Sequence, residues 1–463
     1  MLRGIGFRRG ELAPDRALRA ASREERADPG ENDLEMSWDP EPIAPAERGH
    51  GAAGEAGAPR RRRLFTWKRL LLTVFVAGLI AAGGAYSQKE RIAPEVANLS
   101  RRIIGDERTA RVEGWFFRIE DQIDRTKYRL LGGETNPFAT EAVRVMFAPR
   151  SPGREVYVFV GKGESIDSGL LAAEGFRPLP MRPPETRKLR EHPEAGEGIW
   201  TSVGLPASSG SEPLMMKTFI RPDTSRPYAL VGVLLLDHRK VRLHMVGGTE
   251  DPGGDRGVKG SGKIAEGDQK DLLVAWNGGF KGPHGGFGMV ANGLTYRPLR
   301  NGLATLCVKK GGALVMGEYG RDVTWDDSME ACRQNVILLV DKGEVSRRTA
   351  EGNDTWGYVQ VNSSEFITWR SAVGVTKDGN LLVAAGNSLS AETLAKALWA
   401  AGAEYAMQLD INSPYVLTGM FFKQADGTLK SEKFMDSMPD TASRFLRTQE
   451  RDFMYVTRDE RAY

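Results

Sequence analysis

The longest apolar run of the chain lies near the N-terminus, at residues 70–86, which include no charged side chain. As a helix rising about 1.5 Å per residue, it would span about 25 Å, the low end for crossing the hydrocarbon core of a bilayer. A buried core helix is the competing interpretation. It is disfavoured because the run is apolar on every face and follows a basic cluster at residues 60–69. The pattern therefore predicts one transmembrane helix.

The residues before this run have the composition of a disordered tail. Residues 1–69 are rich in Arg, Glu, Ala, Gly and Pro, and they carry too few large apolar side chains to offset the entropy of the chain. Six basic residues without an acid directly precede the span, whereas the four that follow are diluted by Glu90 and Glu95. This bias predicts a single-pass protein of the cell inner membrane, with a cytoplasmic N-terminus and a periplasmic or extracellular main domain.

The residues on either side of the span also allow another interpretation, a cleaved export signal. The sequence Arg62-Arg63-Leu64-Phe65 resembles a twin-arginine export signal, and the small residues at 83–85 could serve a signal peptidase. A leader of about sixty residues argues against cleavage. We therefore prefer an uncleaved signal-anchor.

The exported part begins with a helical pattern and continues with weaker strand patterns. Apolar residues recur at spacings near three and four over residues 106–131, which predicts an amphipathic helix within a juxtamembrane segment at 87–135. Residues 141–148 and 155–161 are β-branched and apolar, as in strands. A stretch rich in Pro, Gly and Ser follows at 176–213. We expect an accessory region at 136–213 and a boundary before the main domain at 214–463.

The main domain shows many strand patterns and few helical ones. Residues 228–236 and 240–246 resemble a hairpin, and Lys377-Asp378-Gly379-Asn380 predicts a tight turn between two further strands. Ser390 can cap a helix that ends before Gly402, and residues 404–409 then lead a strand to Asp410. The pattern indicates an α+β fold, a mixed sheet domain with few helices. Further strands are expected at 272–276, 287–290, 304–308, 313–316, 336–340, 372–376 and 381–385.

Composition narrows the functional classes. The net charge is only +3 and charges of both signs are interspersed, so nucleic-acid binding is not expected. No Cys/His cluster has the spacing of metal ligands, and neither a metal nor a cofactor is predicted. The two cysteines, Cys307 and Cys332, both follow the span. They could form a disulfide in an oxidising compartment or remain two separate buried thiols, and the sequence leaves both readings open.

Three polar or Gly-rich breaks beside apolar strands are candidates for chemistry. The first is Asn277-Gly278-Gly279-Phe280, where the glycines permit a sharp turn or close approach to a ligand, unless the segment is an ordinary turn. In the second, Arg370 enters an apolar strand; its planar fork suits a phosphate or carboxylate, or a structural ion pair. In the third, Asp410 follows a strand among polar neighbours, as a turn residue also would.

Taken in this order, these segments resemble the phosphodiester glycosidase family over about residues 215–425. The family pattern has an Asn-Gly-Gly/Thr-Phe strand end and an Arg-Thr/Ser-Ala-Val-Gly strand, here 277–280 and 370–374. It closes with Leu-Asp-Gly-Gly-Gly-Ser. The chain keeps Leu409-Asp410 but has Ile411-Asn412 in place of the first two glycines. The resemblance implies the family's fold, whereas the lost glycines leave activity open.

The resemblance implies hydrolysis of a glycosyl phosphodiester, in which these residues would have the following roles. A sugar joined through its anomeric carbon to phosphate already has a good leaving group, whose departing charge Arg370 could stabilise. Asp410 could act as base toward water or stabilise an oxocarbenium-like centre. Asn277, with the substrate-binding candidates Gly278, Gly279, Phe280, His284 and Asn412, could orient sugar hydroxyls or phosphate oxygens. For a second acid, Asp322, Asp326 and Asp327 are available, and nothing in the sequence selects one.

Two functional classes therefore remain. One is a membrane-anchored extracytoplasmic hydrolase that cleaves a sugar from a glycosyl phosphodiester or a related envelope glycan. The other is a non-catalytic envelope module that binds a glycan or a protein through the same fold. Neither the sugar nor the oligomeric state is predicted by the sequence. Convergence of Asn277, Arg370 and Asp410 on one open pocket would favour the enzyme.

Overall fold

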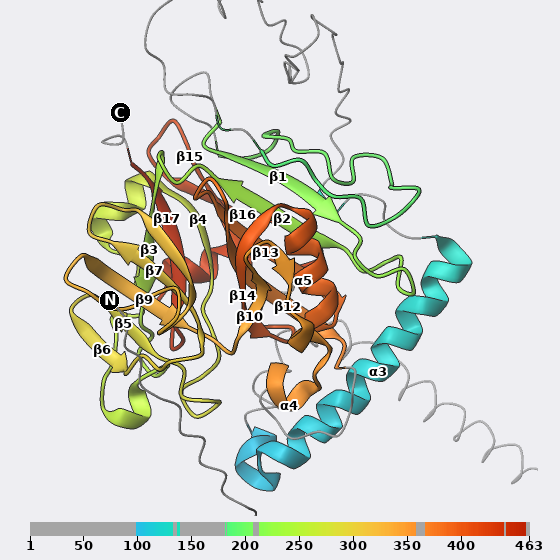
Figure 1. The fold of residues 1–463 in the computed structure, drawn as a ribbon, viewed down its shortest axis with the longest axis horizontal. Coiled ribbons are helices and arrows are strands. Elements are labelled where there is room, and N and C mark those ends of the chain that lie inside the picture. Colours follow the sequence, from blue (N-terminus) through green and yellow to red (C-terminus); the bar gives the residue numbers. More distant parts are fainter. Residues whose placement is uncertain are drawn as a thin grey trace, which may run out of the picture. The chain divides into compact units, whose positions relative to one another are not determined.

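A computed structural model of the chain describes residues 99–132, 137–138, 181, 183–206, 213–357, 366–438 and 441–459 (Figure 1). The chain divides into two units, 1–71 and 72–463, and the described residues all belong to the second. The predicted tail at 1–69, the span at 70–86 and the strands at 141–148 and 155–161 lie outside the described residues. Within the described part, no helix has the length and apolar character needed to cross a membrane.

The largest sheet has seven antiparallel strands in the order β1-β2-β13-β12-β14-β10-β11. Its inner strands are apolar on both faces, since helix α5 covers one face and other strands cover the opposite one. The predicted turn at 377–380 joins β12 to β13 as expected. The bounds are β1 (Met215–Ile220), β2 (Val231–Leu236), β10 (Leu338–Asp341), β11 (Glu344–Val345), β12 (Thr368–Thr376), β13 (Leu381–Leu389) and β14 (Ala403–Ile411).

Two five-stranded antiparallel sheets complete the domain. One has the order β16-β15-β4-β17-β3, with β3 (Val241–Val246), β4 (Leu272–Asn277), β15 (Thr418–Lys423), β16 (Leu429–Lys433) and β17 (Phe453–Arg458). The other has the order β6-β5-β9-β7-β8, with β5 (Met289–Ala291), β6 (Leu294–Arg297), β7 (Ala304–Lys309), β8 (Leu314–Glu318) and β9 (Met329–Gln334).

The third sheet contains the disulfide that the sequence left open. Cys307 on β7 and Cys332 on β9 are direct cross-strand partners, their Cα atoms are 4.1 Å apart, and they form a disulfide. Both side chains are fully buried. The bonded reading is confirmed.

Helices are few among the described residues, as predicted. Helix α3 (Asp106–Leu131) matches the predicted amphipathic helix. Helix α5 (Ala391–Ala400) begins at the expected cap, where the Ser390 hydroxyl accepts from Thr393 N and the Thr393 hydroxyl accepts in return from Ser390 N. The remaining helical segments are short: residues 99–104, α4 (Asn353–Trp356), η2 (Gly254–Arg256), η3 (Glu266–Asp271), η4 (Arg347–Ala350) and η5 (Ala442–Leu446).

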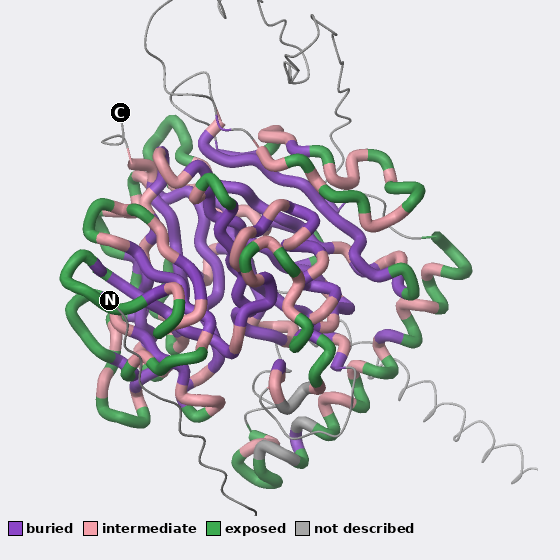
Figure 2. Tube along the Cα trace, viewed as in Figure 1, coloured by how far each residue is buried: buried purple, intermediate pink, exposed green. Residues whose placement is uncertain are grey.

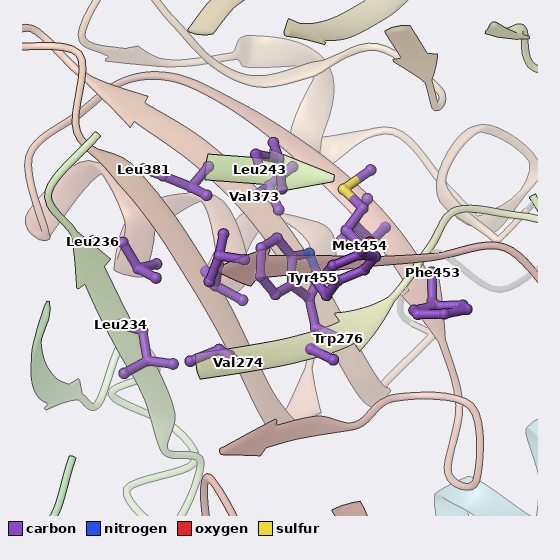
Figure 3. Close-up of a cluster of buried hydrophobic side chains, with 14 of the residues drawn as sticks. Leu234, Leu236, Leu243, Val274, Trp276, Val373, Leu381, Phe453, Met454 and Tyr455 are labelled. Carbon is purple, nitrogen blue, oxygen red and sulfur yellow. The ribbon is translucent and has the colours of Figure 1, made fainter. Parts of the chain in front are cut away.

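The core lies between the seven-stranded sheet and the sheet that contains β4 and β17. Figure 3 shows Leu234 and Leu236 of β2 facing Trp276 of β4 and Tyr455 of β17. Strand β2 alternates its side chains between this core and a second one beneath α5, and every residue of the strand is buried (Figure 2). The sheet-dominated α+β prediction is therefore confirmed.

The predicted hairpin at 228–236 and 240–246 is wrong. The two segments do form strands, β2 and β3, but they belong to different sheets. Strand β2 is paired on one edge with β1 and on the other with β13, which leaves no edge for β3. The connecting turn is stabilised instead by Asp237, whose carboxylate accepts from Arg239 at 2.7 Å. Sequence-adjacent strands thus separate because both edges of β2 are taken by other strands.

Candidate active site

A polar pocket of about 300 Å³ opens where the seven-stranded sheet meets the sheet containing β4 and β17. It receives the end of β4, the end of β14 and the segment that leads from η5 into β17. Its lining combines polar side chains with three aromatic rings, of which Tyr415 comes from the β14–β15 connection. The lining residues are Asn277, Gly278, Asp410, Tyr415, Arg444, Phe445, Thr448, Gln449, Glu450, Arg451, Asp452 and Phe453.

Asp410 is held in this pocket by its own backbone. Its N–H donates to the Gly278 carbonyl at 3.1 Å, and its carbonyl accepts from the Ser371 hydroxyl at 2.9 Å. One carboxylate oxygen accepts from Ile411 N at 2.9 Å. The other forms an ion pair with Arg451. Because the main chain is bonded to β4 and to β12, the carboxylate has a fixed direction toward the pocket.

The electrostatics of the pocket favour a carboxylate that can exchange a proton. Burial raises the pKa of Asp410 above its ordinary value of 3.8, and the nearby Asp452 adds to the rise, while Arg451 opposes it. For Arg451, burial lowers the pKa, but the surrounding acids, Asp410 first, outweigh it and raise the value. A carboxylate with a raised pKa beside a cation is suited to general acid–base chemistry.

Tyr415 lines the pocket beside two cations, of which Arg451 is itself part of the lining. The Arg451 guanidinium carbon lies 4.5 Å from the centre of the Tyr415 ring, and Lys281 Nζ lies 5.8 Å from it. Burial lowers the pKa of Lys281, and the neighbouring Arg451 lowers it further. Arg444 fixes the loop that carries the ring by donating to the Pro414 carbonyl at 2.8 Å and to the Tyr415 carbonyl at 3.1 Å. The two cations therefore place positive charge beside the ring, which suits an anionic ligand.

Asn277 reaches the pocket, but its side chain already has partners. Its amide nitrogen donates to the Ser371 hydroxyl at 2.9 Å and to the Gly278 carbonyl at 3.0 Å, while its amide oxygen accepts from Leu417 N at 3.1 Å. These bonds connect β4 to β12, which lies in the other sheet. Asn277 thus ties the two sheets together at the base of the pocket.

The glycines of the Asn-Gly-Gly motif make room for a buried ion pair. Arg333 and Asp452, both inaccessible to solvent, pair at 2.8 Å. A Cβ on Gly278 would lie 2.0 Å from the Asp452 carboxylate, and one on Gly279 would lie 2.8 Å from the Arg333 guanidinium. Packing against the protein's own side chains therefore requires glycine at both positions.

Arg370 lies outside the lining of the pocket. Its guanidinium donates to the carbonyls of Leu389, Trp356 and Phe366 at 3.0, 3.2 and 2.9 Å, and to the Gln408 side-chain oxygen at 2.6 Å. The neighbouring Ser371 points to Asn277 and Asp410 instead. The structure thus brings Asn277 and Asp410 to one pocket and directs Arg370 elsewhere.

The remaining predicted residues are also placed by the structure. Phe280 is buried in the core beneath α5, and only Gly278 of the predicted substrate-binding set lines the pocket. His284 is half-buried in the turn after Lys281. Asn412 accepts from the Thr368 hydroxyl at 3.0 Å. The acids considered as a second catalytic group, Asp322, Asp326 and Asp327, lie near β8 and β9 and do not line the pocket.

Two lining residues of the site, Tyr415 and Arg451, and the nearby cation Lys281 were missed by sequence reasoning. Tyr415 and Arg451 flank strands that the sequence pattern did not predict, and Lys281 directly follows the first motif without matching any spacing rule. A signal was available for Arg451, since Glu450, Arg451 and Asp452 form a charged run directly before an apolar strand. Among the described residues, no group of three or more His, Cys, Asp or Glu side chains is placed to hold a metal ion.

Comparison with known proteins agrees with the resemblance drawn from the motifs. Residues 270–410 match the model of the phosphodiester glycosidase family. No curated protein sequence matches the chain. Among solved structures, the auto-inhibited catalytic domain of zebrafish N-acetylglucosamine-1-phosphodiester alpha-N-acetylglucosaminidase is similar, with 17% identity and a TM-score of 0.35 over 55% of this chain and 87% of that one. A hypothetical protein from Synechocystis has 12% identity and a TM-score of 0.29 over 53% and 62%.

Proposed function

We propose that the domain is a glycosidase-type hydrolase that cleaves a glycosyl phosphodiester, with its reaction centre at Asp410 and Arg451. The family match at residues 270–410 supports the reaction class. The observation that carries the assignment is the buried carboxylate of Asp410, fixed by its backbone and paired with Arg451 in a pocket of about 300 Å³. A pocket of this size can take one sugar phosphate, and the positive charge beside Tyr415 suits the phosphate.

The reaction needs only one carboxylate at this site. In a glycosyl phosphodiester, the bond between the anomeric carbon and the phosphate oxygen breaks, and the phosphate departs with the electron pair. This leaving group is a weak base, so it needs no proton from a general acid. Asp410 takes a proton from the attacking water, or stabilises the oxocarbenium-like centre, and water supplies the new bond to the anomeric carbon. The products are a free sugar and a phosphomonoester.

Arg451 has two roles in this proposal. It is paired with Asp410, and its charge opposes the rise that burial causes in the pKa of that carboxyl. When a phosphodiester enters, the same guanidinium can bind the phosphate oxygens and stabilise the charge that grows as the bond breaks. Lys281, whose Nζ lies 5.8 Å from the centre of the Tyr415 ring, adds a second positive charge near the pocket. Arg370 donates its hydrogen bonds to carbonyls of the protein and takes no part in the cleavage of the glycosyl phosphate bond.

Membrane attachment belongs to the same proposal. The apolar run at 70–86 and the basic cluster before it support an anchor in the inner membrane with the domain outside the cytoplasm. A reporter that is active only outside the cytoplasm, fused after Tyr463, should then be active. An inactive fusion at normal expression would contradict this topology.

A binding module remains the second candidate, and one observation favours it. In place of the first two glycines after the family's aspartate, this chain has Ile411, which is buried, and Asn412, which has a positive φ of 73° and accepts a hydrogen bond from Thr368. These side chains restrict close approach of a substrate to the backbone at this point. A module of this kind would bind a glycosyl phosphate or envelope glycan without turnover.

The full chain, purified in detergent, tests the proposal with a panel of glycosyl-1-phosphodiesters of different sugars. Release of reducing sugar together with phosphomonoester is expected. Asp410→Asn should lower kcat/KM by about a thousandfold, since it removes the base or the charge at the reacting centre. Asp327→Asn, at an exposed loop position away from the pocket, is the matched control and should be unchanged. Binding without turnover by the unmodified protein would favour the module instead.

A further inference from the structure

Helix α3 has a surface that the proposed hydrolase site does not use. On one side it is bonded to the domain: Asp121 accepts from Arg226 at 3.0 Å and from the Tyr228 hydroxyl at 2.6 Å. The ring of Phe117 packs edge-on against Phe366 with 5.6 Å between centroids. These contacts fix which side of the helix faces the domain.

The opposite side of α3 is apolar and exposed. Large apolar side chains recur along it at helical spacing and line a shallow groove. Their exposed fractions are high for residues of this kind: Val112 60%, Trp115 59%, Phe116 45%, Ile119 38%, Ile123 40% and Leu130 77%. An apolar surface of this extent on one helix marks an interaction site. Figure 2 shows the exposed segments along α3.

The charges of α3 are segregated in the same way. Among the side chains described from 108 to 131, every charged residue classed as exposed is basic: Arg108, Arg111, Arg118, Lys127 and Arg129. The acids of the same stretch, Glu113, Glu120, Asp121 and Asp124, are buried or half-buried. The outward surface of the helix therefore combines Trp, Phe and Ile with Arg and Lys, and its acids turn away from it.

We infer that this outward surface of α3 docks on an anionic lipid bilayer, with the helix lying in the interface. Aromatic and aliphatic side chains enter the boundary between headgroups and acyl chains, while the flanking Arg and Lys side chains extend to the lipid phosphates. Charge complementarity selects this partner, since a basic surface is attracted to anionic headgroups. The connection is also short, because only residues 87–105 separate the predicted span from the helix.

A second copy of the chain fits this surface less well. Two such helices packed face to face would bring Arg118 and Lys127 of one copy close to the same basic groups of the other, and like charges across an interface are repulsive. Lipid headgroups supply the opposite charge. The inference is independent of the hydrolase, since no residue of the pocket lies on α3.

A depth measurement on the full chain tests this docking. The native cysteines are joined in a disulfide, so Ile119→Cys gives a single thiol for a fluorophore. The labelled protein is placed in nanodiscs of phosphatidylcholine containing about one-third phosphatidylglycerol and a lipid with a nitroxide on its acyl chain. The nitroxide should quench the label at 119 strongly. A label at Ala425→Cys, in an exposed turn far along the chain, should be unaffected.

A charge-reversal variant tests the basic side chains, and two further outcomes would show that something other than lipid covers the helix. In the protein labelled at 119, the pair Arg118→Glu and Lys127→Glu should reduce quenching by the acyl-chain nitroxide several-fold, and so should discs of phosphatidylcholine alone. Equal quenching in neutral discs would overturn the anionic selectivity. A label that neither the lipid nitroxide nor aqueous iodide can quench would show that another segment of the chain covers the helix. Protection that grows with protein concentration would show a second copy. Either result overturns the inference.

Discussion

Two arginines of the domain, Arg370 on β12 and Arg451 directly before β17, have opposite surroundings. Arg370, which the family motif singles out, gives its hydrogen bonds to three backbone carbonyls and Gln408. Arg451, which no motif predicts, pairs with Asp410 at the edge of an open pocket, and its side chain is 21% exposed. Both guanidiniums stay protonated. Arg370 is bonded to groups inside the protein, whereas Arg451 is paired with a carboxylate that a ligand can reach.

A residue of a family motif can therefore be required for the fold rather than for the reaction. Arg370 joins the carbonyls of Trp356 and Phe366, which bracket residues 357–365, to the seven-stranded sheet. A substrate phosphate could reach Arg370 only by displacing these carbonyls. Arg451 needs to exchange only one partner, Asp410. On this account, Arg370 contributes to stability and Arg451 to turnover.

Replacing Arg370 should have the largest effect, on folding rather than on chemistry. Arg370→Met removes the charged donor of four buried acceptors, of which the Trp356 carbonyl keeps a second donor in Gln408 Nε2. The free energy of unfolding should therefore fall by about 3–5 kcal/mol, because several buried acceptors lose a charged donor. Urea unfolding measures this change. Arg447→Met, at an exposed position, is the control, with a change expected within about 0.5 kcal/mol. Unchanged stability together with lost activity would reverse the roles assigned to the two arginines.

Replacing Arg451 should mainly affect catalysis. Arg451→Met should lower kcat/KM by about a hundredfold, equivalent to about 2.7 kcal/mol of transition-state stabilisation, because the departing phosphate loses its cation. The stability loss should be smaller than for Arg370→Met. Asp410 can take up a proton when its partner is removed, because burial raises its pKa. Steady-state kinetics and urea unfolding of the same preparation separate the two effects; a stability loss as large as that of Arg370→Met would contradict this.

Replacing Gly278 of the Asn-Gly-Gly motif should reduce stability by an intermediate amount. Gly278→Ala would place a Cβ 2.0 Å from the Asp452 carboxylate, so the Arg333–Asp452 pair must shift. We expect about 2 kcal/mol less stability in thermal or urea unfolding, as for overpacked sites. Gly267→Ala is a matched control, since its Cβ would meet no atom within 4 Å. A neutral Gly278→Ala would show that the ion pair is not what requires glycine there.

The smallest effect concerns pH. Since the pKa of Asp410 is raised above 3.8, kcat/KM should rise with pH through a midpoint above that value, as the carboxylate loses its proton. Arg451→Met removes the charge that opposes the rise, so the midpoint should move higher still, whereas Arg370→Met should leave it in place. Identical midpoints in Arg451→Met and in the unmodified protein would mean that this pair does not control the titration.

The same titration affects stability, with a defined sign. A carboxyl whose pKa is raised on folding binds its proton more tightly in the folded state. Its contribution to stability is present at low pH and is lost as the pH rises from 3.8 through the folded pKa. In Asp410→Asn this pH-dependent loss should be absent over that window. Urea unfolding at a series of pH values measures it, and a persisting loss would assign it to another group.

Local patterns predicted several elements that position the site. The strands at β4, β12, β13 and β14 and the capped helix α5 were all expected, because their apolar runs and turn residues are contiguous in the sequence. The pairing of β2 with β1 and β13 could not be read locally, since β13 is about 150 residues away in the chain. The predicted hairpin of residues 228–236 and 240–246 was wrong for this reason.

The site itself was predicted in part. Asn277 and Asp410 reach one pocket, as their positions at strand ends suggested. The direction of Arg370 was not available from the sequence, because it depends on which of two neighbouring residues, Arg370 or Ser371, faces the pocket. Arg451 could not be connected to Asp410, because strands β15 to β17 were not predicted and their contacts with β4 are distant in sequence.

The most direct test is a crystal structure of the protein with a non-hydrolysable glycosyl phosphonate, in which carbon replaces the oxygen between sugar and phosphorus. We expect the phosphonate oxygens to lie within hydrogen-bond reach of the Arg451 guanidinium, with the anomeric carbon beside the Asp410 carboxylate and with Arg370 still bonded to its carbonyls. A phosphonate bound at Arg370, or at any site away from the pocket that holds Asp410, would contradict it.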